Sequence, residues 1–71
     1  MNPAAIRVTV NGEPRELPDG LSLAQLLEHF GLDARAVVVE LNREIVRRTA
    51  LERTPVRAGD AVELVHFVGG G

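Results

Sequence analysis

Apolar and polar residues alternate over residues 6–10, which read Ile-Arg-Val-Thr-Val. Alternation among β-branched side chains is typical of a half-buried strand. Asn11-Gly12 follows at once, and this pair favours a type I′ turn because both residues tolerate positive φ. The pattern therefore predicts a hairpin, with a second strand near residues 15–17 and a turn at residues 18–20.

The pattern then changes to that of a helix. Ser22 and Gln25 have the spacing of a capping box, which predicts a helix that begins at Leu23. Its apolar residues fall at i, i+3, i+4 and i+7, so they form one stripe that needs a sheet to cover it. The stripe consists of Leu23, Leu26, Leu27 and Phe30. Gly31 suits the left-handed position that ends a helix.

The second half of the chain is again typical of strands. Residues 37–41 form a strand too apolar to be simply alternating, so either both of its faces are covered or one exposes apolar side chains. Asn42-Arg43 predicts a turn into a short strand at residues 44–46. A final strand is expected from Ala61 to Phe67, after a turn at residues 58–60.

Residues 47–55 show no periodicity, so we expect an irregular segment in which Leu51 and Val56 fill gaps in the core. The order of elements is then strand, strand, helix, strand, short strand, strand. It predicts an α+β domain of the β-grasp arrangement, with a mixed sheet of four to five strands packed against one main helix. We assign residues 1–67 to this domain and residues 68–71 to a flexible C-terminal tail.

Composition excludes several classes of function. A chain of 71 residues forms one domain with little room for an enclosed pocket, so we do not expect an enzyme. The net charge of −2 argues against nucleic acid as a partner, and no segment suits a membrane span or a signal peptide. We expect a cytoplasmic monomer. Cys and Lys are both absent, which excludes thiol chemistry and side-chain isopeptide bonds on this chain.

Three glycines close the chain directly after the last predicted strand. A frayed end or a cloning remnant would explain Gly69, Gly70 and Gly71 without any function. As a functional feature, residues without Cβ atoms could thread a narrow channel in a partner. Residues 68–71 would reach about 13–14 Å when extended. The ionised Gly71 carboxylate could then attack the α-phosphate of ATP in that partner.

Other candidate groups are weaker. His29 and His66 are the only histidines, too few for a metal site, and we expect none. Glu40, Glu44, Asp60 and Glu63 suit solvated strand edges and turns better than acid–base catalysis. Alternation along the last strand places Val65 and Phe67 on the face opposite Val62 and Leu64. With Val38 and Val68 they could form an exposed partner-binding patch, although packing at the rim of the core would also explain them.

Three segments resemble one known family. Residues 39–46, residues 59–65 and the closing His66-Phe67-Val68-Gly69-Gly70-Gly71 resemble the sulfur carrier proteins of thiamine biosynthesis. The resemblance covers nearly the whole chain and implies a ubiquitin-like β-grasp fold. The chain departs from the family pattern at Arg47, where Pro is usual, and at Leu51, where an aromatic residue is common.

The resemblance also implies a mechanism. Gly71 would hold the sulfur as a thiocarboxylate, and Gly70 would be the second residue of an essential pair. A partner related to ubiquitin-activating enzymes would adenylate the carboxylate with ATP and Mg, while this chain would bind no cofactor itself. A cysteine desulfurase or another donor would supply sulfur, and thiazole synthase would receive it.

Alternatives remain open at this stage. The same tail would serve a sulfur carrier for molybdopterin synthesis or for 2-thiolation of transfer RNA. A ubiquitin-like modifier of other proteins would use the same adenylated glycine with an amine as the nucleophile. A plain interaction module would tolerate deletion of Gly70 and Gly71, whereas a carrier would not.

Overall fold

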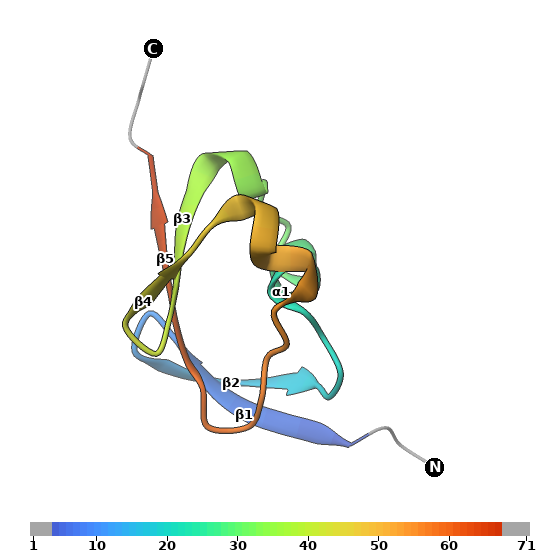
Figure 1. Ribbon diagram of the computed structural model, residues 1–71. Coiled ribbons are helices and arrows are strands. Elements are labelled where there is room, and N and C mark those ends of the chain that lie inside the picture. The colour runs from blue at the N-terminus through green and yellow to red at the C-terminus, as the bar shows by residue number, and fades with distance from the viewer. Residues whose placement is uncertain (1–3, 68–71) are drawn as a thin grey trace.

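Five strands form one mixed sheet, and all helical segments of the described chain lie on one of its faces (Figure 1). The computed structural model describes residues 4–67. The strands are β1 (Ala5–Val10), β2 (Glu13–Pro18), β3 (Val37–Leu41), β4 (Glu44–Val46) and β5 (Ala61–His66). Their order is β2-β1-β5-β3-β4, with β1 and β5 parallel and every other pair antiparallel. The predicted α+β architecture is confirmed.

Two tight turns build the two hairpins. Asn11 and Gly12 have φ values of 52° and 81°, as a type I′ turn requires between β1 and β2. Asn42 and Arg43 adopt 51° and 73° between β3 and β4, so the second turn has the same geometry without a glycine. Both turns stand where the sequence predicts them.

Helix α1 (Leu23–His29) begins and ends as its sequence dictates. Gln25 N–H donates to Ser22 Oγ over 3.1 Å, and Ser22 N–H donates to Gln25 Oε1 over 2.9 Å, which completes the capping box. Gly31 has a φ of 70°, and Leu32 N–H donates to the carbonyl of Leu27 over 2.8 Å. This Schellman-type ending stops the helix and turns the chain back toward the sheet.

The core lies between the sheet and the helical layer. Its side chains come from alternate positions of the strands, from the predicted stripe of α1 and from the segment after β4. The buried residues are Val8, Val10, Leu17, Leu23, Leu26, Leu27, Val37, Val39, Leu51, Val56, Val62 and Leu64. Phe30 is half-buried against them. Leu51 and Val56 fill the core as expected.

Two helical turns were not predicted. The 3₁₀ segment η1 (Ala34–Ala36) precedes β3, and η2 (Arg48–Arg53) lies within residues 47–55, where an irregular segment was expected. A 3₁₀ helix has three residues per turn and buries few side chains, so it leaves no 3.6-residue pattern to detect. Arg47, at the start of η2, has a φ of −66°, which is also the value that proline would fix.

The last strand ends one residue earlier than predicted, at His66 rather than Phe67. Phe67 N–H still donates to the carbonyl of Ala36 over 3.0 Å, so the backbone remains attached to the sheet there. Within residues 4–67, no helix is both long and apolar enough to cross a membrane.

Candidate partner-binding surface and C-terminal tail

Strand β5 is the central strand of the sheet and the last element before the tail. Two asparagines attach it to the neighbouring hairpins. Asn11 Oδ1 accepts from Leu64 N–H over 2.7 Å, and Asn42 Oδ1 accepts from Ala61 N–H over 2.9 Å. The two turn residues thus fix the register of β5 from both sides.

The side chains of β5 alternate between two environments. Val62 and Leu64 are buried under the helical layer, whereas Val65 is 55% exposed and Phe67, directly after the strand, is 63% exposed. No helix of the described chain covers the face that Val65 occupies (Figure 1). The predicted sorting of these four side chains is confirmed, and rim packing does not account for Val65 and Phe67.

Neighbouring strands extend this exposed surface. Val38 on β3 stands directly opposite Val65, on the face that the sequence suggested, but it is half-buried and not fully exposed. Ile45 on β4 is 68% exposed and stands opposite Glu40, on the same face. We define Val38, Ile45, Val65 and Phe67 as the apolar patch. Contiguous exposed apolar side chains usually mark a protein interface.

Sequence reasoning missed Ile45. Its signal is the alternation in Glu44-Ile45-Val46, in which an inward Val46 requires an outward Ile45. The strand is only three residues long, so the pattern alone does not decide which of the two apolar residues faces the core. The register against β3 decides it, because Val46 pairs with the buried Val39.

Two carboxylates lie beside the apolar patch. Glu40 on β3 and Glu63 on β5 are directly opposite each other, and Glu40 is half-buried. Like charges at facing positions of a sheet repel and destabilise the pairing. On the β1–β2 half of the same face, Arg7 faces Glu16 and forms an ion pair with an N–O distance of 3.4 Å. The apolar patch is therefore bordered by two facing negative charges, and neither β3 nor β5 supplies a positive charge between them.

The remaining predicted site residues form the tail. Val68, Gly69, Gly70 and Gly71 lie outside the described residues, so their assignment rests on the sequence and on the strand that leads to them. The described chain ends at Phe67 beside Ala36, at one end of β5 and next to the apolar patch.

The histidines are separated. The His29 ring makes an edge-on contact with Phe30, with ring centroids 5.4 Å apart. His66 stands opposite Val37 at the end of β5 and is exposed. No group of three metal-ligating side chains occurs within residues 4–67.

This fold, with a final strand that leads into three glycines, defines a ubiquitin-like domain. The family model described as ThiS family matches residues 8–71, so the chain belongs to the ThiS family. The match extends to the last glycine.

Individual relatives agree. The sulfur carrier protein ThiS of Thermus thermophilus is 41% identical over 64 residues, which cover 90% of this chain and 98% of that protein. The crystal structure of the thiamine biosynthesis protein ThiS from Geobacter metallireducens superposes with a TM-score of 0.79 at 40% identity, over 93% of this chain and all of that one. The family resemblance and the β-grasp fold are thereby confirmed.

A longer protein also matches. The thiazole synthase of Paramagnetospirillum magneticum is 38% identical over 66 residues, which cover 93% of this chain. The chain spans only 20% of the length of that relative.

Proposed function

We propose that this chain is a sulfur carrier for thiazole formation in thiamine biosynthesis, with the Gly71 carboxylate as the group that holds the sulfur. The observation that carries the proposal is the family match over residues 8–71. Because it includes the three glycines, the tail belongs to the same pattern as the domain. A cloning remnant would not continue a family pattern to its final residue.

The chemistry consists of a nucleotidyl transfer to the Gly71 carboxylate, followed by transfer of the activated acyl group to sulfur. In an adenylating partner that holds ATP and Mg²⁺, a carboxylate oxygen attacks the α-phosphorus, and pyrophosphate leaves. The outer sulfur of a persulfide, supplied by a cysteine desulfurase or another donor, then attacks the acyl carbon, and AMP leaves with the bridging oxygen. A thiol reduces the acyl disulfide so formed, which frees the thiocarboxylate and leaves a disulfide between the thiol and the donor. The resulting thiocarboxylate gives its sulfur to thiazole synthase and returns to the carboxylate form. The chain acts as a co-substrate in each step and catalyses none.

The apolar patch supports this role by its position. Val65 and Phe67 lie on the last residues before the tail, so a partner that covers them also receives the tail at its own active site. Fixing the domain in this way converts the attack of the carboxylate into an effectively intramolecular step. Glu40 and Glu63 favour a partner whose interface carries Arg or Lys beside an apolar centre.

The absence of two residue types fits a reactive C-terminus. A thiol or an amine on the same chain would compete for the activated acyl group. This sequence has no Cys and no Lys side chain. The acyl adenylate and the thiocarboxylate therefore meet no thiol and no lysine amine on their own chain.

Thiazole synthase is the proposed acceptor. The relative from Paramagnetospirillum magneticum bears that name and contains a region similar to this whole domain within a longer chain. A carrier-like region joined covalently to the rest of a thiazole synthase supports a working association between the two. Molybdopterin synthase and the enzymes of transfer RNA 2-thiolation are the acceptors to compare with it.

Intact-mass spectrometry tests the carrier role. We expect incubation with an adenylating enzyme, ATP, Mg²⁺, a cysteine desulfurase, cysteine and a thiol reductant to produce the mass change of one oxygen replaced by one sulfur. The matched control is a chain without Gly71, which should stay unchanged. Failure of the shift with partners that load the Thermus protein would contradict the proposal, and so would a branched product on lysines of other proteins. Transfer of the Gly71 sulfur into thiazole phosphate, and not into molybdopterin, tests the acceptor.

A further inference from the structure

The two edges of the sheet differ in how well they are protected. Edge strand β2 contains Pro14 and ends with Pro18, and proline has no N–H to offer to an added strand. Edge strand β4 contains neither Pro nor Lys, and Ile45 in its centre is the most exposed large apolar side chain within residues 4–67. Only the β4 edge is suited to accept a further strand.

The backbone of Ile45 points toward that open side. A two-residue turn makes Leu41 and Glu44 a hydrogen-bonded pair, so the next pair, Glu40 with Ile45, is a non-hydrogen-bonded one. In an antiparallel ladder, residues of such pairs direct their N–H and C=O groups away from each other. Ile45 therefore presents both groups to a partner strand.

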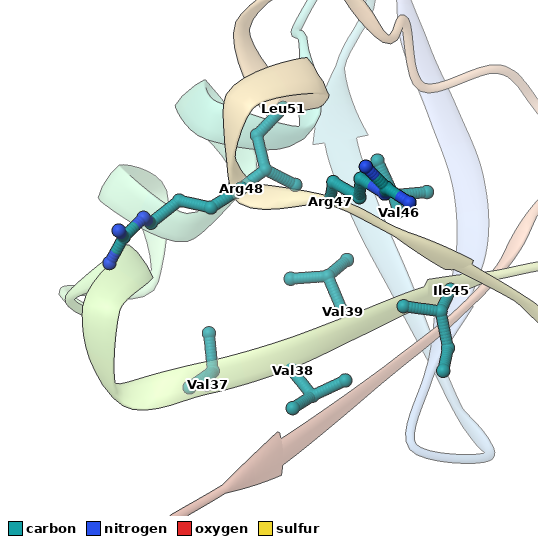
Figure 2. A pocket seen from close by; sticks show the side chains of 8 residues that line it. All are labelled: Val37, Val38, Val39, Ile45, Val46, Arg47, Arg48 and Leu51. Carbon is teal, nitrogen blue, oxygen red and sulfur yellow. The ribbon is translucent and has the colours of Figure 1, made fainter.

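A small cleft lies beside the same edge. Strand β4 leaves β3 after Val46, and the chain turns into η2, which opens a cleft of about 170 Å³ against the first half of β3. Figure 2 shows Val37 and Val39 pointing from β3 toward Leu51, while Val38 points to the other side of the strand. This volume is well below the roughly 300 Å³ of small-molecule pockets, but it resembles apolar cavities of about 150 Å³ that hold one benzene ring. It suits a single apolar side chain.

Two arginines stand at the mouth of the cleft. In Figure 2 the Arg48 side chain extends toward one end of the cleft, and Arg47 lies beside Val46 near the other end. Neither forms an ion pair with any residue of the described range 4–67. Together with Arg43 in the turn, they give residues 43–48 three positive charges against Glu44 alone, in a chain whose net charge is −2. The local charge is therefore opposite to that of the whole molecule.

From these features we infer that the β4 edge binds an extended, acidic segment of a partner protein. The segment adds a strand beside Ile45, places one aliphatic side chain in the cleft, and sets a carboxylate on each flank against Arg47 and Arg48. Charge complementarity selects this occupant, because an acidic segment at the β4 edge meets three arginines against a single glutamate in residues 43–48. The inference does not depend on the chemistry of Gly71.

Peptide titration tests this site. The probe is a fluorescein-labelled peptide with the sequence Asp-Asp-Val-Leu-Val-Asp-Asp, and the matched control peptide has Lys in place of each Asp. We expect the acidic peptide to bind with a Kd at or below about 1 mM at low salt, the weak range for a short segment, and to shift the amide NMR signals of residues 37–39 and 45–51. Raising the salt concentration should weaken this binding.

Variants of the chain separate the contributions. The double charge reversal Arg47→Glu/Arg48→Glu should weaken binding by at least about tenfold, and Ile45→Pro, which removes the outward N–H at a tolerant edge position, by about fivefold or more. Arg53→Glu/Arg57→Glu makes the same charge change away from the cleft and should change the Kd by less than about twofold. Sulfur loading of Gly71, assayed separately, reports on the proposed function alone.

Several results would overturn the inference. These are equal binding of the Lys peptide, an equal loss in the Arg53/Arg57 variant, and peptide shifts confined to other residues. Absence of NMR shifts at 2 mM peptide would also overturn the inference, since that concentration exceeds the expected Kd of about 1 mM. Concentration-dependent shifts of the same amides without any peptide would assign the edge to a second copy of the chain instead.

Discussion

The exposed face of the sheet has two halves: in one, facing residues carry opposite charges, and in the other they carry the same charge. On the β1–β2 half, facing residues Arg7 and Glu16 form an ion pair. On the β5–β3–β4 half, facing residues Glu40 and Glu63 carry the same charge and border the apolar patch. The first half is complementary within itself, whereas the second has both apolar and charged groups that another molecule could satisfy. The half with these unsatisfied groups is the one from which the tail leaves.

The largest expected effect comes from placing a charge in the apolar patch. We expect Val65→Asp to lower kcat/KM for adenylation by about 30- to 1,000-fold, because the loss of a central interface contact costs about 2–4 kcal/mol. The side chain is exposed in the free domain, so stability should change little. Thr9→Asp, on the β1–β2 half of the same face, is the matched control and should stay within about twofold. Equal losses in both variants would remove the functional distinction between the halves.

The next effect concerns how each half is attached to β5. Asn11→Ala removes the partly buried acceptor of Leu64 N–H and places Ala at a φ of 52°, so unfolding free energy should fall by about 2–3 kcal/mol. Asn42→Ala places Ala at a similar φ of 51° but loses only exposed hydrogen bonds, so it should cost about 1–2 kcal/mol. Urea denaturation measures both. Asn11→Gly keeps the positive φ but not the acceptor, so it separates the two contributions. If its free energy of unfolding equals that of the wild type, the hydrogen bond contributes nothing to stability.

A smaller effect should differ in sign between the halves. Glu63→Gln removes a like-charge pair and should stabilise the domain by about 0.3–1 kcal/mol, whereas Glu16→Gln removes an ion pair and should destabilise it by about 0.2–0.5 kcal/mol. Added salt should shrink both differences. If the sheet face binds a basic partner, Glu63→Gln should also weaken that binding. Changes of the same sign in the two variants would refute the charge comparison.

The smallest effect lies at Asp33, before β3. Hydrogen bonds from the side chain and backbone of Arg35, with the guanidinium charge, lower the pKa of Asp33 below its ordinary 3.8. A carboxyl with a lowered pKa in the folded state stabilises the fold above its unfolded pKa and loses that effect as the pH falls through the folded one. The stability difference between wild type and Asp33→Asn should therefore shrink from about pH 5 to about pH 2. Thermal unfolding across this range measures it, and a constant difference would contradict the assignment.

Local signals made much of the fold predictable. Asn11-Gly12, the Ser22–Gln25 capping box and Gly31 each act within a few residues, and all three features stand where the sequence places them. Alternation along β5 likewise predicted the exposure of Val65 and Phe67.

Features that depend on register could not be predicted in the same way. Glu40 faces Glu63 only because β3 and β5, which are distant in sequence, pair at one particular offset. Ile45 lies on a strand too short for its alternation to fix a face, and η2 has no 3.6-residue period. The tail carboxylate remains a prediction from sequence and family, because Gly71 lies outside the described residues.

The central place of β5 has a consequence for how the molecule is made. The strand is the last of the five in the sequence, yet it lies between β1 and β3 and joins the two hairpins into one sheet. Contacts between Thr9 and Ala61 close a long loop, and such non-local pairing forms late and slowly. The sheet thus cannot be completed before β5 has left the ribosome. Under the proposed function, the tail can be charged only after the domain has folded, because the apolar patch is in place only once β5 has paired with β3.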